Sequence, residues 1–371
     1  MNPSGVQPLY LVTALLAIGG TMFGVYSRYP HLSPYLLLCS ALALILRVRK
    51  VHRDLQEDVE DAIDFKRLRS FDMGSRGERV KDQLRGHDAV VDAVVAGLRR
   101  SLSLAGPGRT LGAFMLVGPT GTGKTYLAEL FAKELYPDSQ PLILRMNQYK
   151  QPEDVYTLIG PPPGQPGYEV GGALTRPVLE NPYRVILLDE LDKCHKDVRD
   201  CLYNVLDAGE CREKSSGRLV HFNACVFFAT SNAGVEELRA LKAEPLAESA
   251  RMGRMRDVLT DKAGFEKPLL ARFDDVYFLD TLPPLHVAEV ACLRLAAQWK
   301  QYGIDVRYAE PELILEAMRQ NEDFREYGVR QLYRLIQELT DESIQAARKA
   351  GQTKVKLGID PATKKLKVSA A

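Results

Sequence analysis

The chain opens with two hydrophobic stretches that carry almost no charge. Residues 9–26 form a run of 18 mostly apolar or small residues, and no charged side chain occurs before Arg28. A helix of roughly 20 apolar residues spans the hydrocarbon core of a bilayer, so this run predicts a membrane-spanning helix. The second run, 32–46, has only 15 residues, which is short for a span. The pattern therefore predicts a membrane anchor over residues 1–50 with one or two transmembrane segments.

The flanking residues bear on the number and orientation of the spans. The two runs fit either a helical hairpin or one span followed by an interfacial segment. A cleaved signal peptide or a buried core helix is the alternative. A signal peptide has basic residues near its start, however, and the first 27 residues of this chain contain none. Four basic residues lie within 47–53, after the second run, whereas only Arg28 lies between the runs. By the positive-inside rule we expect the C-terminal bulk of the chain in the cytoplasm, beside a membrane that we take to be the bacterial inner membrane.

Beyond the anchor the chain becomes strongly charged and then alternates between strand-like and helix-like patterns. Residues 51–79 are first acidic and then basic, which is typical of a helical stalk or linker. From residue 80 to residue 282, short apolar runs alternate with segments of helical period. This alternation predicts an α/β fold with a parallel sheet between helices.

A smaller domain is expected at the C-terminal end. Two prolines at 283–284 precede segments of helical periodicity at 286–303 and 311–320. The sequence at 355–370 has two strand-like segments around a turn, which predicts a strand pair. We therefore expect a small α-dominated domain over residues 283–371.

Composition limits the classes of function. The 371 residues include 49 Lys and Arg against 48 Asp and Glu, a formal charge of +1, so no nucleic-acid partner is expected from the overall charge. Hydrophobic residues make up 46% of the chain, enough to bury one large core or two modest ones. The six cysteines show neither a C-x-x-C pair nor metal-ligand spacing, so we expect reduced thiols and no disulfide scaffold.

A phosphate-binding motif connects the first predicted strand to a helix. The strand at 112–117 is followed at once by a glycine-rich octapeptide and then by a helix at 125–136. The octapeptide consists of Gly118, Pro119, Thr120, Gly121, Thr122, Gly123, Lys124 and Thr125. Its glycines let backbone N–H groups wrap phosphate oxygens at a helix N-terminus, Lys124 reaches the β- and γ-phosphates, and the Thr125 hydroxyl ligates Mg²⁺. The sequence therefore predicts a site for ATP and Mg²⁺.

Two further predicted strands end in polar residues. The run 184–188 leads into Asp189 and Glu190, and the run that starts at Cys225 leads into Asn232. Because the carboxyl ends of parallel strands meet at one edge of a sheet, we expect these side chains near the phosphates. Asp189 would hold Mg²⁺ through water, Glu190 would orient and polarise the attacking water, and Asn232 would reach that water or the γ-phosphate.

The order of these motifs resembles the AAA+ ATPases of the Clp and heat-shock unfoldase group, specifically the second ATPase module of the disaggregase branch. The resemblance covers about residues 80–360. Besides the glycine-rich loop it rests on GHDAVVDAVVAGLRRS (86–101), RMNQY (145–149), LIGPPPGQPGYEVGG (158–172), LDELDKCH (188–195), NVLDAGE (204–210), ATSNAG (229–234) and GVRQL (328–332).

The resemblance implies roles for three residues and a domain plan. Asn232 matches the family's sensor 1, and Arg330, in a small C-terminal lid domain, matches sensor 2. Arg272, in the segment PLLARFDDV, matches the arginine finger that completes the nucleotide site of an adjacent subunit. The resemblance thus implies a P-loop AAA+ module over residues 80–282 and a lid over residues 283–371. It also implies a homo-oligomeric ring, usually a hexamer.

One segment departs from the family pattern in a way that affects function. Where threading members of the family carry the aromatic residue of a G-Y-V-G stretch, this chain has Gly164-Gln165-Pro166-Gly167. Gln165 lacks a flat apolar face and Pro166 stiffens the loop, which argues against gripping a polypeptide there. Tyr168 follows, and the resemblance gives it a framework role.

Two functions follow from these expectations. The first is an ATP-hydrolysing ring, anchored in the membrane, that remodels, unfolds or extracts protein substrates at the cytoplasmic face. The second is an ATP-dependent switch or scaffold that assembles a membrane-bound secretion, conjugation or defence complex without threading polypeptide. Both involve a protein or membrane-protein partner and the lipid bilayer, and both use the same nucleotide chemistry.

Overall fold

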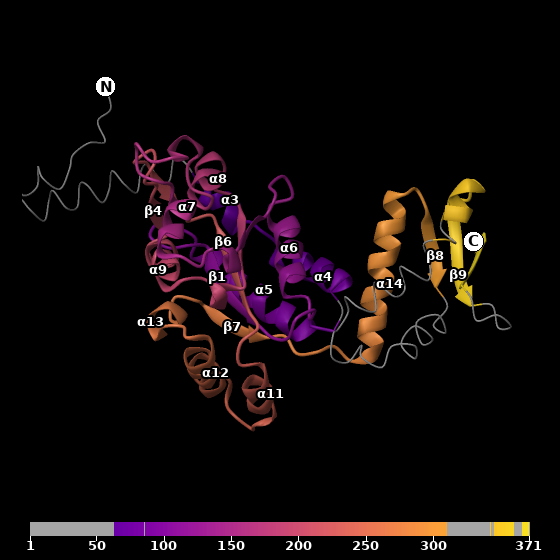
Figure 1. The fold of residues 1–371 in the computed structure, drawn as a ribbon. Helices are drawn as coiled ribbons and strands as arrows, with labels where there is room; N and C mark the ends of the chain where they lie inside the picture. The colour runs from indigo at the N-terminus through magenta and orange to yellow at the C-terminus, as the bar shows by residue number, and fades with distance from the viewer. Residues whose placement is uncertain (1–62, 85, 310–341, 343–344, 360–365, 371) are drawn as a thin grey trace, which may run out of the picture. The chain divides into compact units, whose positions relative to one another are not determined.

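The computed structural model describes residues 63–84, 86–309, 342, 345–359 and 366–370 (Figure 1). The predicted membrane anchor, residues 1–50, lies outside these ranges. Within them, no helix is both long and apolar enough to cross a bilayer. The compact unit that contains all the described residues begins at Ile63.

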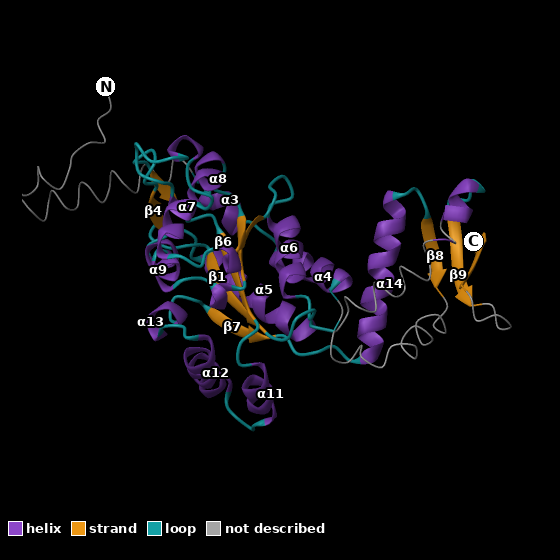
Figure 2. Ribbon diagram, in the orientation of Figure 1, coloured by secondary structure: helices purple, strands orange, loops and turns teal. Residues whose placement is uncertain are grey.

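A five-stranded parallel sheet forms the centre of the larger described part. Its strands, in spatial order, are β2 (Leu142–Arg145), β3 (Val185–Asp189), β6 (Val226–Ser231), β1 (Gly112–Val117) and β7 (Asp275–Phe278) (Figure 2). Every neighbouring pair is parallel. The strands therefore present their carboxyl ends at one edge of the sheet, where connecting loops form ligand sites in such folds. The three strands predicted from the sequence, and the parallel sheet, are confirmed.

Helices connect these strands. Before β1 lie α3 (Phe65–Arg69), α4 (Met73–Gln83) and α5 (Asp88–Ser103), and after it lies α6 (Lys124–Leu135). Between β2 and β3 lie α7 (Val155–Ile159) and α8 (Thr175–Glu180), with short 3₁₀ turns η2 (Met146–Gln148), η3 (Pro152–Asp154) and η4 (Tyr168–Val170). After β3 come η5 (Leu191–Lys193), α9 (Lys196–Asp200), α10 (Leu202–Asp207) and a hairpin of β4 (Glu210–Arg212) and β5 (Leu219–His221). The segment from β6 to β7 contains α11 (Val235–Ala243), α12 (Glu248–Ala263) and α13 (Lys267–Leu270).

Both faces of the sheet are covered. β1 and β6 are buried along their whole length, as expected for a parallel sheet between two helical layers. On one face the ring centroids of Phe114 and Phe228 lie 5.6 Å apart, and Phe131 of α6 stacks on Phe228 at 5.8 Å. On the other face, alternate residues such as Met115 join a core cluster that reaches α9 to α13. Figure 2 shows α5 and α6 on one side of the sheet and α7 to α9 on the other.

The first described helices pack into this core, inside the segment predicted as a linker. α3 buries Phe65 and Leu68, and α4 buries Met73 and Val80. Both helices contact α5. These apolar side chains recur on one face of short helices, between charged positions. The many charged residues therefore make the apolar face difficult to recognise in the sequence. The compact unit accordingly begins at Ile63.

The C-terminal part combines a long helix with a small sheet. α14 (Pro284–Gln301) has Pro284 in its first turn, where a fixed φ and a missing N–H cost nothing. The sheet has the order β10 (Leu366–Ala370), β9 (Lys354–Ile359), β8 (Asp305–Ala309), with β10 antiparallel and β8 parallel to β9. Trp299 and Val355 are buried in its core. The strand pair predicted at 355–370 is confirmed, and the helix predicted at 311–320 lies outside the described residues.

Candidate nucleotide site

The glycine-rich loop leaves the end of β1 and leads directly into α6. Its first residue, Gly118, has a φ of 154° and donates its N–H to the Ser231 carbonyl oxygen at 3.2 Å, which ties the loop to β6. A Cβ atom at Gly118 would collide with the carbonyl oxygen of Leu279. Gly121 and Gly123 have φ values of 86° and 96°, in the left-handed region that favours glycine. The loop therefore has a conformation for which these three glycines are required.

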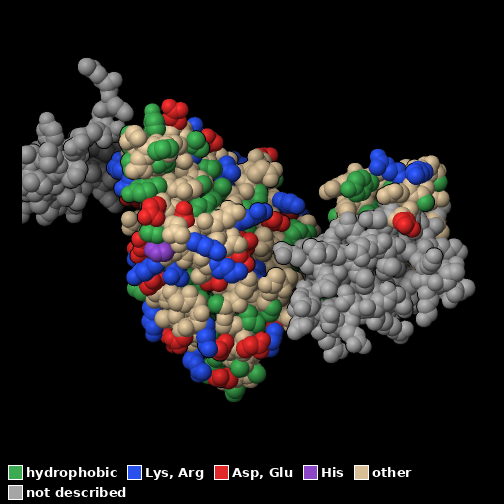
Figure 3. Space-filling model, in the orientation of Figure 1, with side chains coloured by type: hydrophobic (Ala, Val, Ile, Leu, Met, Phe, Trp, Pro, Cys, Tyr) green, Lys and Arg blue, Asp and Glu red, His purple; other side chains and the backbone are tan. Residues whose placement is uncertain are grey.

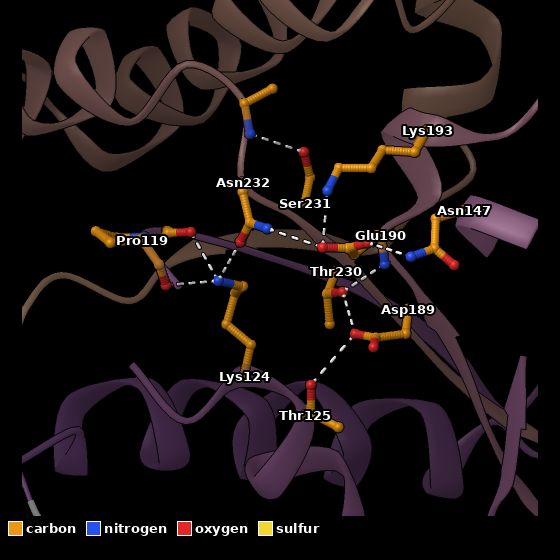
Figure 4. Close-up of polar contacts among 12 residues, drawn as sticks. Pro119, Lys124, Thr125, Asn147, Asp189, Glu190, Lys193, Thr230, Ser231 and Asn232 are labelled. Carbon is orange, nitrogen blue, oxygen red and sulfur yellow. Dashed lines mark hydrogen bonds and ion pairs between the residues drawn. The ribbon is translucent and has the colours of Figure 1, made fainter. Parts of the chain in front are cut away.

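Lys124 lies among acceptors on the inner side of the loop. Its Nζ donates to the carbonyl oxygens of Gly118 and Pro119 at 2.7 and 2.8 Å, and to Oδ1 of Asn232 at 2.7 Å (Figure 4). The contact with Asn232 joins the loop after β1 to the end of β6. It brings together Lys124, predicted to reach the β- and γ-phosphates, and Asn232, predicted to reach the attacking water or the γ-phosphate.

Thr125 and Asp189 meet where the sequence predicts an Mg²⁺ site. The Thr125 hydroxyl donates to Oδ1 of Asp189 at 3.2 Å. Both side chains offer oxygen ligands, which Mg²⁺ prefers, and Mg²⁺ usually takes its other ligands from water and substrate phosphates. No cluster of three or more His, Cys, Asp or Glu residues within the described ranges could hold a metal. The pair therefore fits an Mg²⁺ ion that binds together with a triphosphate and neutralises part of its charge.

Thr230 on β6 connects the two acids that end β3. Its hydroxyl donates to Oδ1 of Asp189 at 2.7 Å and accepts the N–H of Glu190 at 2.8 Å (Figure 4). Thr230 is buried, so both hydrogen bonds are shielded from water. Sequence reasoning misses this residue, because threonine in a strand also suits simple packing. Its position near the end of β6, two residues before Asn232, is the available signal.

Glu190 has a strained backbone. It is the one non-glycine residue in the described part of the chain with a positive φ, at 57° with ψ 51°. Such a conformation costs about 1–3 kcal/mol and is found mostly at functional sites. The N–H of Glu190 is held by Thr230, and its carbonyl oxygen accepts the N–H of Lys193 at 3.0 Å. These bonds fix the turn that directs the carboxylate toward Asn232 (Figure 4).

The Glu190 carboxylate has three donors around it. Oε1 accepts from Nζ of Lys193 at 2.9 Å and from Nδ2 of Asn232 at 3.4 Å, and Oε2 accepts from Nδ2 of Asn147 at 2.8 Å. A carboxylate offers about four acceptor positions, so Oε2 has one left for a water molecule beside these three contacts. The hydrogen bond from Lys193 is the main cause that lowers the pKa of Glu190 below its ordinary value. Glu190 is therefore ionised at neutral pH, and this arrangement suits orienting and polarising a water molecule.

His87 braces the loop from the side of α5. Its Nε2 forms a hydrogen bond with the carbonyl oxygen of Thr122 at 2.9 Å, and the side chain is buried. Burial lowers the pKa of His87 below its ordinary value, so the ring is neutral at neutral pH and Nε2 carries the hydrogen that the carbonyl oxygen accepts. Sequence reasoning misses His87 as well, since a histidine before a helix carries no signal of what it contacts.

Arg272 lies outside this set of hydrogen bonds. Its Nη2 pairs with Asp207 at 3.1 Å, its Nη1 donates to the Pro268 carbonyl oxygen at 2.6 Å, and its guanidinium lies 4.7 Å from the ring centroid of Tyr203. Asp207 and Tyr203 belong to α10. In the described part of the chain, therefore, the predicted arginine finger contacts α10 and α13 and does not join the nucleotide-site residues. Arg330 lies outside the described residues.

The same region matches a known protein family. Residues 109–276 match the family described as AAA domain (Cdc48 subfamily), and this range contains the glycine-rich loop, the ends of β3 and β6, and Arg272. This segment is an AAA domain. The matched range includes β1, β3 and β6, the strands whose carboxyl ends contribute residues to the site, so the family match and the site geometry point to the same region.

Relatives of the Clp type extend the match. The ATP-dependent Clp protease ATP-binding subunit ClpE of Lactococcus lactis is 34% identical over 301 residues, which cover 79% of this chain and 40% of that protein. Chaperone protein ClpB of Rhodopirellula baltica is 37% identical over 220 residues, 59% of this chain and 25% of its own length. Chaperone protein ClpB of Mycobacterium tuberculosis is 35% identical over 283 residues, 74% of this chain and 31% of its own length.

The chain thus spans 40% or less of the length of these relatives. The AAA domain and these relatives together support ATPase activity, and the chain is similar to proteins of the Clp type. Those proteins are named as an ATP-binding subunit and as chaperones.

We expect Glu190→Gln to stop ATP hydrolysis and to leave ATP binding intact. The amide keeps the shape of the side chain but loses the charge that polarises the attacking water. Removing a positioned base typically slows a reaction by about 10²–10⁴-fold. Phosphate release and titration with a fluorescent ATP analogue measure the two effects, with Glu180→Gln on the exposed end of α8 as a matched control. Turnover at the wild-type rate would remove Glu190 from this role.

Thr230→Val should impair hydrolysis while the near-identical shape preserves packing. The change leaves the Glu190 N–H without its acceptor and removes one of the two donors to Oδ1 of Asp189, and an unsatisfied buried group costs about 1–3 kcal/mol. We expect turnover to fall about tenfold or more, because the reacting groups lose their fixed positions. Thr230→Ser retains the hydroxyl and should restore most of the rate. Equal turnover of the valine and serine variants would show that the bridge is not needed.

His87→Ala should weaken ATP binding. The change removes the donor to the Thr122 carbonyl oxygen in the loop. A hydrogen bond of about 1 kcal/mol corresponds to roughly fivefold in an equilibrium constant, so the affinity for ATP should fall by about that factor. His87→Gln supplies an amide N–H and should retain more of the affinity. Fluorescence titration with an ATP analogue gives both dissociation constants, and identical values for the two variants would contradict the bracing role.

Proposed function

We propose that this chain is the subunit of an ATP-hydrolysing ring, a homo-oligomer expected to be a hexamer, that remodels, unfolds or extracts proteins beside a membrane. One observation carries the proposal. The ends of β1, β3 and β6 bring Lys124, Thr125, Asp189, Glu190 and Asn232 into one connected set of hydrogen bonds. Such a set positions a triphosphate, an Mg²⁺ ion and an attacking water together, which is what ATP hydrolysis requires.

Hydrolysis at this site depends on positioning and charge stabilisation. The loop N–H groups and the Lys124 ammonium bind phosphate oxygens, so Lys124 exchanges loop carbonyls for phosphate. Glu190 holds the attacking water at Oε2 and polarises it, and the Asn232 amide orients the water or the γ-phosphate. Thr125 and Asp189 would hold Mg²⁺. Lys193 keeps Glu190 ionised, since its hydrogen bond lowers the pKa of that carboxyl group.

Arg272 supports the ring assembly in this proposal. A guanidinium is permanently charged and its forked donors match phosphate oxygens. In one chain it is bound to Asp207 and Tyr203 of α10. We infer that it leaves these contacts for the γ-phosphate bound by an adjacent subunit. Each site would then be completed by its neighbour, and hydrolysis would depend on assembly.

The proposed location and partners rest on sequence and relatives. The apolar run 9–26 and the basic residues within 47–53 support a membrane anchor with the ATPase domain in the cytoplasm. The relatives are named as a Clp protease subunit and as chaperones, which supports a protein as the partner. We therefore propose a protein substrate or membrane-protein partner at the lipid bilayer.

A second function is an ATP-dependent scaffold or switch for a membrane-bound secretion, conjugation or defence complex. One observation favours it: Gln165 and Pro166 are exposed in the loop where threading members of the resembled family carry an aromatic residue. Electron cryomicroscopy of the full chain in detergent, with a slowly hydrolysed ATP analogue, separates the two functions. Polypeptide density in the central channel supports remodelling, and an ordered ring with an empty channel supports the scaffold.

Mixing two inactive variants tests the shared site. Arg272→Ala subunits keep Glu190 and Glu190→Gln subunits keep the arginine, so each variant alone should hydrolyse ATP very slowly. In a ring mixed at equal amounts, about a quarter of the interfaces pair an intact Glu190 with an intact Arg272 from the neighbour. We expect that fraction of wild-type turnover to return, measured by phosphate release. A mixture no faster than its components would show that Arg272 acts within its own subunit or not at all.

A further inference from the structure

Lys193 contacts Glu190 twice within one turn. Its main-chain N–H donates to the Glu190 carbonyl oxygen at 3.0 Å, and its Nζ donates to Oε1 of the same residue at 2.9 Å. The two residues stand three positions apart across η5, and side chains at that spacing lie one above the other in a 3₁₀ turn. The short turn that follows the strained backbone of Glu190 therefore also brings the ammonium group to its carboxylate.

The turn that carries Lys193 is held on both sides. Leu191 before it and Cys194 after it are buried, and the N–H of His195 donates to the Tyr149 carbonyl oxygen at 2.8 Å. This last bond joins the end of η5 to the segment that follows β2, and η2 contacts η5. The Lys193 backbone therefore has a defined place beside the site, although its side chain is 46% exposed.

The ion pair of Lys193 and Glu190 contributes little to stability. Water and salt screen exposed pairs, so their effect on folding is small. Figure 3 shows Lys and Arg interspersed with Asp and Glu over the surface where Figure 1 places α9, the helix that follows η5. This surface carries mixed charge, so a long-range attraction of triphosphate is a poor account of Lys193. Its effect should fall on the group that it contacts.

The three donors to the Glu190 carboxylate respond differently to a bound triphosphate. Asn147 and Asn232 are neutral amides, whereas Lys193 is a cation. In the proposed reaction, Lys124 leaves Oδ1 of Asn232 for phosphate, and the amide turns to the attacking water or the γ-phosphate. The contact of Asn232 with Oε1 is also the longest of the three, at 3.4 Å. Lys193 therefore stays as the donor to Oε1 in the state that reacts.

The charge of Lys193 has a second effect on the carboxylate. A bound triphosphate adds negative charge next to Glu190 and Asp189, and like charges repel. A Glu190 carboxylate held by amides alone would turn away from the γ-phosphate. The ammonium group offsets part of this repulsion. By occupying Oε1, it also leaves Oε2 as the oxygen that accepts a hydrogen bond from the attacking water.

We propose that Lys193 is a positioning residue for ATP hydrolysis, which keeps the Glu190 carboxylate directed at the attacking water once triphosphate is bound. The assignment rests on the proposed function, because it requires that Glu190 orient this water. Lys193 acts through its contact with Glu190, whereas Lys124 binds phosphate itself. Loss of Lys193 should therefore slow the chemical step and leave the binding of ATP nearly unchanged.

Steady-state kinetics of the full chain separates positioning from attraction of the substrate. Lys193→Met keeps the length of the side chain and loses its charge, and we expect kcat to fall about tenfold or more, since the reacting groups lose their fixed positions. KM should stay within about twofold, because binding of the ground state is retained. Lys193→Arg keeps a charged donor and should retain most of the rate. Lys196→Met, at a lysine that is 59% exposed on α9, is the matched control and should change neither constant.

An added amine provides a second readout. Because the Lys193 side chain is about half exposed, ethylammonium can enter the space that Lys193→Ala leaves. Ethylammonium should raise the turnover of this variant severalfold, since it supplies both a charge and an N–H donor. Tetramethylammonium at the same concentration has the charge and no N–H, so it should not raise turnover. Equal rescue by the two ions would contradict a role for the hydrogen bond.

Binding of two phosphate mimics tests the role without turnover. ADP with beryllium fluoride resembles bound ATP, and ADP with aluminium fluoride resembles the transition state with its attacking water in line. Titration of the full chain with a fluorescent ADP analogue and each fluoride gives the two affinities. Lys193→Met should weaken the aluminium fluoride complex about tenfold and the beryllium fluoride complex less than about twofold. In the Glu190→Gln background, the ratio of the two affinities should change less than about twofold, because the partner of Lys193 is absent.

Three results would overturn the assignment while the proposed function stands. One is a wild-type kcat in the Lys193→Met variant. Another is a higher KM with an unchanged kcat, which would make Lys193 an attraction for triphosphate. The third is an equal loss of aluminium fluoride binding in both backgrounds, which would show that Lys193 does not act through Glu190. If the wild-type chain hydrolyses no ATP, the proposed function fails and the assignment fails with it. Thermal unfolding midpoints check that each variant keeps the fold.

Discussion

The candidate nucleotide site depends on one buried hydroxyl group, that of Thr230. It accepts the N–H of Glu190 and donates to Asp189, so a single group on β6 fixes the backbone of one acid and the side chain of the other. The left-handed conformation of Glu190 costs about 1–3 kcal/mol. The hydrogen bond from the Glu190 N–H to the Thr230 hydroxyl joins two neutral groups, and such a bond contributes about 0.5–1.5 kcal/mol. The cost of the strained backbone and the contribution of the hydrogen bond are similar in size. The strained turn therefore persists where Thr230 lies level with the end of β3 and can form this bond.

That level is set by the core of the sheet. Leu188 pairs with Ala229 between β3 and β6, and Met115 pairs with the same Ala229 between β1 and β6. A shift of one residue would turn Thr230 to the opposite face of the sheet and exchange the side chains that β6 packs against the two helical layers. The aromatic contacts of Phe228 with Phe114 and Phe131 oppose such a shift. The packing of the core therefore also fixes the geometry of the candidate site. Substitutions in the core that move β6 should also move Thr230.

The sequence predicts those parts of the site that are contiguous motifs or strand ends. The glycine-rich loop, Asp189 and Asn232 follow apolar runs directly, so their place at the edge of a parallel sheet follows from the pattern. Thr230, Asn147 and His87 escape prediction, because their partners become known only with the spatial order of the strands. The packing of α3 and α4 against α5 escapes it for another reason, since charged residues surround the apolar faces of these helices. Tyr168 is 42% exposed, which differs from the framework role that the family resemblance implies, and this exposure depends on how the ends of its loop are held.

The contacts of Arg272 are compatible with the proposed release of this arginine to an adjacent subunit. Its ion pair with Asp207 lies at the surface, and exposed pairs of this kind contribute about 0–1 kcal/mol. The contact with the Tyr203 ring adds about 0.5–1 kcal/mol at an exposed site, and Nη1 donates one charge-assisted hydrogen bond to the Pro268 carbonyl oxygen. A charge-assisted hydrogen bond from a guanidinium contributes about 1.5–3 kcal/mol, and phosphate oxygens accept two such bonds from the same fork. In the proposed ring, transfer from these contacts to a neighbour's phosphate would therefore become favourable once that phosphate is within reach, and it would couple hydrolysis to assembly without a separate switch.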